Sequence, residues 1–257
     1  MEFYRFTYET YQDVRHNLFK YCLPLLIAAG FLSYFFVVPP TFRNTVDALF
    51  SSLPGQDWLK GASGVVVFGL VAFLMTEVLQ VHHNWYDLYI VRWRYRYATD
   101  FILPRLVQPF GSLIGRRFHE VAERNIKAFQ ERLFYPYVAD RDAKIEKNKL
   151  VRFYEAATVY WMTQLNEIVI MLMLLLAAIC RVVGPKEAAY VGSLLNCSLV
   201  LVFLFAVNRV WVWRAREKVR GATADEIEAI LTNHSEDLQQ RVRKLCQDHD
   251  IPLAEVK

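Results

Sequence analysis

Cysteine is scarce in this 257-residue chain, and its four cysteines form no recognisable pattern. Cys22, Cys180, Cys197 and Cys246 are far apart in the sequence, and no two of them have CxxC spacing. Structural zinc sites and disulfide-rich secreted domains both depend on closely and regularly spaced cysteines. The sequence therefore argues against either class.

The motifs of common enzyme classes are also missing. We find no serine nucleophile elbow, no P-loop and no glycine-rich phosphate cradle. Two histidine sets have helical spacings that suit metal ligands, namely His82-His83 with Asp87 and His119-Glu120 with Glu123. Neither set matches a defined metalloenzyme motif. We therefore predict a protein without cofactor or enzyme activity, and keep a membrane-interface metalloenzyme as an alternative.

Lysine and arginine are nearly absent from two of the stretches that separate four long apolar segments, at 21–38, 62–82, 159–180 and 188–208. Of the 30 basic residues, three lie in 1–20, fourteen in 83–157 and nine in 209–257, but only two each lie in 39–61 and 181–187. A membrane-spanning helix needs about 20 mostly apolar residues. Basic residues collect on the cytoplasmic side of membrane proteins. The pattern predicts four spans with both termini in the cytoplasm.

The predicted fold is an all-α, multi-pass protein of the inner or plasma membrane, with a helical cytoplasmic domain built from the central loop and the C-terminal tail. We predict a cytoplasmic interfacial helix at 1–20, a transmembrane hairpin at 21–82, a central cytoplasmic segment at 83–157, a second hairpin at 158–208 and a cytoplasmic tail at 209–257. The second span should continue as a helix past the membrane, because residues 83–98 contain no glycine or proline. Further helices are expected at 117–136 and at 141–157, the latter continuous with the third span.

The tail is predicted to form two short helices. Thr223 can cap the first, with Glu226 completing a capping box, and Ser235 can cap the second. Leu238, Val242 and Leu245 place an apolar stripe on the second helix. This stripe needs a partner surface, which could be the central cytoplasmic helices or another subunit.

Two carboxylates, Glu77 and Glu167, fall inside predicted spans. A charged side chain in hydrocarbon is costly unless it is paired, protonated or hydrated. Polar residues at helical spacing surround both and predict one shared site in the inner leaflet: Glu77, Gln80, Asn84, Asp87, Gln164, Asn166 and Glu167. This site could be an ion, proton or ligand pathway. It could also be a structural clamp in which polar side chains join neighbouring spans, and this reading is slightly favoured.

Arginine is concentrated next to the predicted cytoplasmic ends of the spans. The planar guanidinium group of arginine carries several hydrogen-bond donors and is well suited to binding phosphate. The candidate contacts for anionic lipid headgroups or a phosphate-bearing ligand are Arg92, Arg94, Arg96, Arg105, Arg116, Arg117, Arg214 and Arg216. Nucleic acid is not expected as a partner, because the tail 209–257 carries nine basic and nine acidic residues.

The layout, although no motif, resembles that of the small four-span effectors of bacterial antiphage signalling systems. By that likeness we expect an oligomeric effector or channel-like protein, gated by a ligand or protein partner on its arginine-rich cytoplasmic domain. A homo-oligomer is expected because four spans enclose little pore and the tail stripe has no evident local partner. A structural subunit that docks a cytoplasmic partner is the main alternative.

Overall fold

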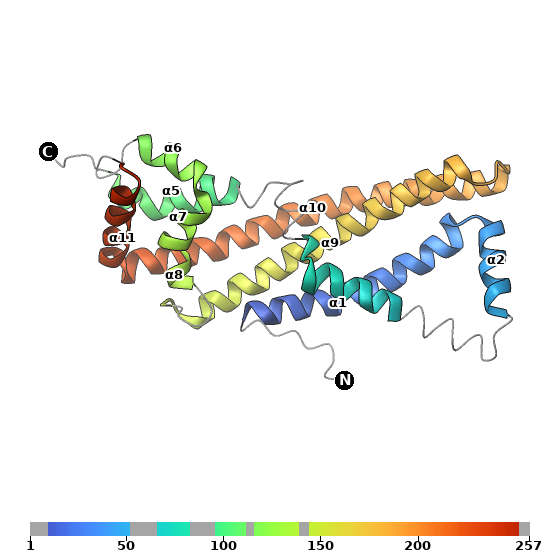
Figure 1. Cartoon of the computed structure of the whole chain (residues 1–257), viewed down its shortest axis with the longest axis horizontal. Helices are drawn as coiled ribbons and strands as arrows, with labels where there is room; N and C mark the ends of the chain where they lie inside the picture. Colours follow the sequence, from blue (N-terminus) through green and yellow to red (C-terminus); the bar gives the residue numbers. More distant parts are fainter. Residues whose placement is uncertain (1–9, 52–65, 83–95, 112–115, 139–143, 252–257) are drawn as a thin grey trace. The chain divides into compact units, whose positions relative to one another are not determined.

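The computed structural model describes residues 10–51, 66–82, 96–111, 116–138 and 144–251 (Figure 1). Every regular element within these ranges is a helix. The α-helices are α1 (Tyr11–Leu32), α2 (Pro40–Ser51), α5 (Leu103–Val107), α6 (Arg116–Arg124), α7 (Ile126–Leu133), α8 (Tyr135–Val138), α9 (Lys147–Val183), α10 (Ala188–Asn233) and α11 (Ser235–Asp248). Short π-helical turns occupy Ser33–Val37, Leu74–Val78 and Ala98–Ile102, and a 3-10 turn occupies Gln108–Phe110.

The chain divides into two compact units. Unit 1 comprises residues 1–6, 15–86 and 158–215, and unit 2 comprises residues 7–14, 87–157 and 216–257. The long helices α9 and α10 each contribute residues to both units.

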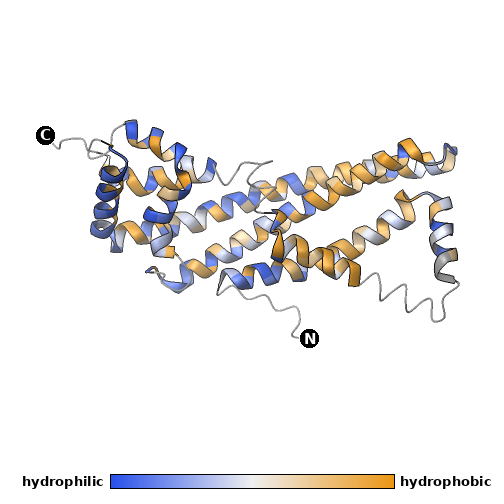
Figure 2. Cartoon of the chain, viewed as in Figure 1, coloured by the Kyte–Doolittle hydropathy of each residue, from blue (hydrophilic) through white to orange (hydrophobic). Residues whose placement is uncertain are grey.

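Three helical stretches are long and apolar enough to cross a membrane: Tyr11–Val37, α9 and α10. Apolar residues are frequent along these stretches (Figure 2), and the accessible side chains there include Phe203, which is 67% exposed. An apolar side chain at that exposure suits lipid better than water. Within the described residues, the expected second span is represented by the apolar helix Val66–Val78, which is shorter than a membrane crossing needs. The total of four spans and the orientation stay predictions.

The first span begins earlier than its apolar segment. We expected an interfacial helix at 1–20 and a span at 21–38, but α1 runs unbroken from Tyr11 to Leu32. Residues 11–23 contain no glycine or proline, so no residue in that stretch ends the helix. Residues 1–9 lie outside the described residues. Pro40 opens helix α2, because proline is well suited to the first position of a helix.

The helix of the second apolar segment stops where we expected it to continue. Its last turn is π-helical, with the Leu79 amide donating to the Leu74 carbonyl at 2.8 Å. Gln80 then has a φ of 45°, which lies outside the right-handed helical region. The prediction of one helix through residue 80 is therefore wrong, and Gln80 does not share a continuous helical face with Glu77. Residues 83–95 lie outside the described residues.

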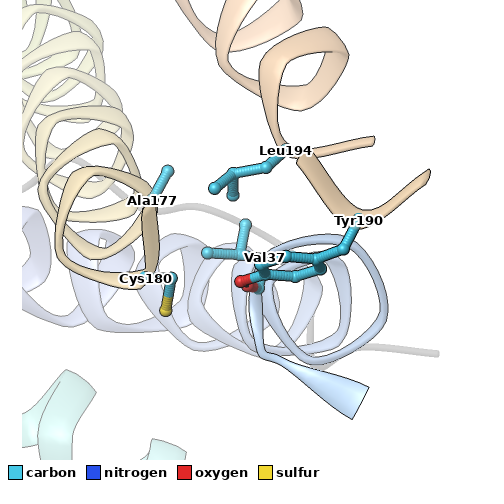
Figure 3. Close-up of a cluster of buried hydrophobic side chains, with 5 residues drawn as sticks. All are labelled: Val37, Ala177, Cys180, Tyr190 and Leu194. Atoms are coloured by element: carbon cyan, nitrogen blue, oxygen red, sulfur yellow. The ribbon is translucent and has the colours of Figure 1, made fainter. Parts of the chain in front are cut away.

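The hairpin between α9 and α10 is closely packed in unit 1. Val37, Ala177, Cys180, Tyr190 and Leu194 form a buried cluster (Figure 3). The Tyr190 hydroxyl donates to the Val37 carbonyl at 2.8 Å. Gly184 is required here, because a Cβ at this position would lie 2.4 Å from the Cys180 carbonyl oxygen. The end of the first span is thus held against the tip of the hairpin.

Unit 2 is a helical layer in which α11 packs against α7. The predicted stripe Leu238, Val242 and Leu245 is buried to 1% exposure or less. Of the two partner surfaces considered, the central helices provide the cover. The stripe therefore gives no argument for an oligomer.

Asp237 links three parts of unit 2. Its Oδ2 accepts hydrogen bonds from the Tyr137 hydroxyl at 3.0 Å, from Lys144 Nζ at 3.0 Å and from Arg241 Nε at 3.2 Å. Burial opposes ionisation of Asp237, but the hydrogen bonds, led by that of Lys144, lower its pKa to about 2. These contacts join α8, the start of the 144–146 turn and α11.

Two predicted helices in unit 2 have different bounds. The expected helix 117–136 is divided into α6, α7 and α8, because Asn125 and Phe134 interrupt it. The helix expected from residue 141 begins at Lys147, and its continuation into the third span is confirmed.

The capping prediction for the tail is wrong. Thr223 and Glu226 lie within α10, which continues unbroken from Ala188 to Asn233. A capping box stabilises the first turn of a helix. Thr223 lies inside α10, where adding one more residue to an existing helix is easier than starting a new one. Ser235 is the first residue of α11, and His234 occupies the cap position without a side-chain cap bond.

Candidate polar site between the apolar helices

The buried face of α9 in unit 1 is polar where an isolated span would be apolar. Thr163, Gln164 and Glu167 are 7%, 0% and 0% exposed, and Tyr160 is 1% exposed. Their spacing of three and four residues places them on one side of the helix. The unbroken helix through Asn166 and Glu167 is what carries these polar groups between the neighbouring helices.

Glu167 forms an ion pair with Arg209 of α10. Arg209 Nη1 lies 3.0 Å from one carboxylate oxygen of Glu167 and 3.3 Å from the other. The Glu167 side chain is 0% exposed, whereas the Arg209 side chain is 45% exposed. A carboxylate buried at this depth depends on its partner, because removal from water is costly for an unpaired charge.

Glu77 forms a second ion pair, with Arg15 of α1. Arg15 Nη2 lies 2.8 Å from Glu77 Oε2, and the same guanidinium donates to the Glu77 backbone carbonyl. That carbonyl belongs to the last turn of a helix, where carbonyl groups lack partners within the helix. Arg15 therefore neutralises the carboxylate and also caps the helix end.

A chain of hydrogen bonds connects α1, α9 and α10. The Tyr21 hydroxyl donates to Asn166 Oδ1 at 2.7 Å, and Asn166 Nδ2 donates to Asn208 Oδ1 at 3.3 Å. Asn208 Nδ2 then donates to the Thr163 carbonyl at 2.9 Å. Polar side chains that bond across helices hold membrane helices together. This arrangement has the geometry of the structural clamp.

Glu77 and Glu167 each form an ion pair with an arginine of their own, and the single site shared by the two carboxylates stays a prediction. Sequence reasoning missed Arg15 and Arg209, which it placed in the interfacial helix and the tail. A usable signal existed: each lies on a helix that continues without a breaker into the apolar segment. Long arginine side chains near the end of a span can reach inward or outward along the helix.

The remaining predicted polar residues have different environments. Gln164 is fully buried, and neither atom of its side-chain amide has a hydrogen-bond partner in the part of the chain that the structure describes. Gln80 is half-buried beyond the end of its helix. Asn84 and Asp87 lie outside the described residues.

The predicted phosphate-contact arginines that the structure describes belong to both units. Arg214 belongs to unit 1, whereas Arg105 and Arg117 belong to unit 2, and all three are exposed. The Arg105 guanidinium lies 3.9 Å from the centre of the Phe101 ring. Arg96 is exposed, Arg216 is half-buried, and Arg116 opens α6. Arg92 and Arg94 lie outside the described residues.

Indole side chains mark the end of the apolar part of α10. Trp211 and Trp213 are 57% and 62% exposed and directly follow Arg209. Exposed tryptophan is typical of the headgroup layer of a membrane. Arg209 lies close to these tryptophans in the sequence, and residues 214–233 of α10 follow the apolar stretch.

The histidine sets offer no ligand geometry in the described residues. His82 is buried, with its ring 5.7 Å from that of Trp161. His119, Glu120 and Glu123 are exposed on α6. Within the described ranges, no three His, Cys, Asp or Glu side chains are grouped so that they could hold a metal ion. His83 lies outside those ranges.

Comparison with known proteins places the chain in a family. The model of the YmfE protein family matches residues 37–243, which is most of the chain. No curated protein and no solved structure shows significant similarity to it. The matched residues include the whole of α2, α9 and α10, and with them the Arg209–Glu167 pair. The chain belongs to the YmfE protein family.

Proposed function

We propose that this protein is a non-enzymatic, multi-pass membrane effector whose closed state is held by ion pairs between its membrane helices. In this proposal it has four spans with both termini in the cytoplasm of the inner or plasma membrane, and it assembles as a homo-oligomer. A phosphate-bearing ligand or a protein partner acts on the arginine-rich cytoplasmic part. The helices respond by opening a channel-like path, in the manner of antiphage effectors.

The observation that carries the proposal is the asymmetry of the Arg209–Glu167 pair. Glu167 is inaccessible, but the Arg209 side chain is 45% exposed and adjoins the tryptophans of the headgroup layer. Arg209 can therefore exchange its partner for water or an anionic headgroup at modest cost, whereas Glu167 cannot. Such a pair holds two helices together until one of them moves.

The continuity of α10 supports a route for that movement. The helix carries Arg209 in unit 1 and continues without a break to Asn233 in unit 2. At about 1.5 Å per residue, Asn233 is about 36 Å along the helix from Arg209. An α-helix transmits axial displacement because its hydrogen-bond ladder is stiff. In this proposal, binding in unit 2 therefore moves Arg209 relative to Glu167.

Ion and dye flux across liposomes tests the proposal. Glu167→Gln keeps the shape of the side chain but removes the charge that holds Arg209, so we expect a flux at least several times that of the wild type. Glu187→Gln is the matched control, because Glu187 is exposed in the α9–α10 hairpin. If wild type, Glu167→Gln and Arg209→Gln are all folded and all sealed, the proposal is refuted.

A structural subunit that docks a cytoplasmic partner is the second candidate. The observation in its favour is that Glu77 and Glu167 are each neutralised by an arginine of the same chain. A purely structural role requires nothing further of these residues. In that case Glu167→Gln lowers the thermal stability without any flux, and a protein partner co-purifies in stoichiometric amount.

A further inference from the structure

Glu226 lies in the interior of unit 2, and no described residue forms a hydrogen bond or ion pair with its carboxylate. It is 1% exposed, and neither of its carboxylate oxygens has a hydrogen-bond partner among the described residues. It belongs to the part of α10 that follows the apolar stretch ending at Trp213. A buried, unpaired carboxylate is strongly unfavourable, and such a group binds a proton instead of remaining charged.

The segment 97–107 covers this part of α10. The Tyr97 side chain is 8% exposed, and its hydroxyl donates to the Val219 carbonyl at 3.3 Å. Ala98, Ile102 and Leu106 follow Tyr97 at helical spacing and are 1%, 4% and 0% exposed. On α10, the neighbours of Glu226 at Ala222, Ile227 and Ile230 are also buried. Glu226 thus has buried apolar neighbours on its own helix, and Tyr97 of the segment 97–107 lies near it.

The charged and titratable groups around Glu226 come from three elements. Tyr97 belongs to the segment 97–107 and Asp225 belongs to α10, and Arg105 and Arg220 lie near Tyr97. Arg152 of α9 forms an ion pair with Asp225 at 3.9 Å, so the positive charge of Arg152 lies beside Asp225.

Burial, with a smaller contribution from Asp225, raises the pKa of Glu226 to about 8. Burial likewise raises the pKa of Tyr97, away from the neutral range.

We propose that Glu226 is a proton-operated switch that fastens the segment 97–107 to α10. The protonated side chain is neutral and stays packed beneath the segment. The ionised side chain needs water, and it reaches water only when the segment separates from α10. The switch lies wholly in unit 2 and does not depend on whether the membrane helices form a pore.

The direction of the pH effect follows from the two protonation states. In the separated state the carboxyl group has an ordinary pKa of about 4.3, and in the packed state its pKa is about 8. Between these values the separated state binds fewer protons, so each pH unit multiplies the ratio of separated to packed forms by about ten. The packed form is therefore favoured in acid and lost as the pH rises, and the dependence levels off above pH 8.

Hydrogen–deuterium exchange on the full chain in detergent or nanodiscs measures this ratio. Exchange is followed at pH 6, 7 and 8 in peptides covering 97–107 and 219–230, after correction for the intrinsic tenfold rise per pH unit. We expect the corrected exchange of the wild type to rise about tenfold per unit. Glu226→Gln, a neutral mimic of the protonated acid, should show no such rise.

Two further variants make the result specific. Glu226→Asp remains ionisable and should keep the pH dependence, whereas Glu228→Gln, at an exposed position two residues along the same helix, should behave as the wild type. The histidines of unit 2, including His234, are present in every variant, so their titration is common to all. A flat wild-type profile, or a slope that persists unchanged in Glu226→Gln, would overturn the proposal.

Discussion

Replacing Arg209 by glutamine should destabilise the protein far more than a typical arginine substitution. The change removes the partner of Glu167, whose side chain is 0% exposed and lies 3.0 Å from Arg209 Nη1. Breaking a buried ion pair by removing one partner costs about 3–5 kcal/mol, because the remaining charge is left in a poor solvent. Since the Arg209 side chain is 45% exposed, water can follow it inward, and the lower end of that range, about 3 kcal/mol, applies.

The companion variant Glu167→Gln should be milder. It leaves no buried charge, the amide oxygen can still accept a hydrogen bond, and Arg209 can turn toward water. We expect a loss of about 1 kcal/mol, the usual net value of one hydrogen bond. The double variant should cost less than the sum of the two single variants, because neutralising Glu167 removes most of the penalty of losing Arg209. The coupling should lie within the range of about 0.5–3 kcal/mol seen for contacting residues.

Thermal unfolding in a mild detergent, followed by tryptophan fluorescence, measures these differences. For chains of this size 1 kcal/mol corresponds to about 2–4 °C, so Arg209→Gln should lower the apparent midpoint by about 6–12 °C. Arg152→Gln is the matched control, because Arg152 is 71% exposed and its pair with Asp225 spans 3.9 Å. Such a surface pair contributes about 0–1 kcal/mol. If Arg209→Gln lowers the midpoint no more than Arg152→Gln, or if the single effects simply add, the assigned role of the pair is wrong.

Two other substitutions test the packing of each unit. Asp237→Asn should weaken three hydrogen bonds in unit 2 and cost about 1 kcal/mol near neutral pH, a figure reduced for solvent screening because the side chain is 38% exposed. The folded-state pKa of Asp237 is about 2, below its ordinary value, so this stabilisation is complete above about pH 4 and is lost as the pH falls toward 2. The unfolding curves of variant and wild type should therefore converge near pH 2. A constant difference between them down to pH 2 would contradict this prediction. Gly184→Ala should lower the unfolding midpoint by several degrees, because the added Cβ would lie 2.4 Å from the Cys180 carbonyl oxygen. Gly192→Ala serves as the control and should change the midpoint little, because a Cβ at that position meets nothing within 4 Å.

Much of the helical architecture could be predicted from the sequence. The long apolar segments anticipate α1, α9 and α10, and the continuity of α9 into its polar N-terminal part follows from the absence of breakers in 147–158. The stripe of Leu238, Val242 and Leu245 also identifies the buried face of α11. These features depend on neighbours three or four residues apart, which a sequence displays directly.

Predictions that depended on helix ends were less successful. Thr223 with Glu226 has the pattern of a capping box, yet both residues are buried inside α10. The same residues can cap a new helix or continue an old one, and burial against the segment 97–107 decides between the two. At Gln80 the opposite error occurs: the helix ends before this residue, although no glycine or proline lies nearby to predict the end.

The sequence by itself determined where the apolar helices lie, the polar face of α9 and the uneven distribution of basic residues, because these are periodic or compositional properties. Only the tertiary structure decided that Glu77 pairs with Arg15, that Glu167 pairs with Arg209 and that Glu226 is enclosed without a partner. Those outcomes depend on distances between helices that are far apart in the chain. The sequence does not show whether an acidic side chain is paired with an arginine, protonated or hydrated. The folded environment determines which of these applies.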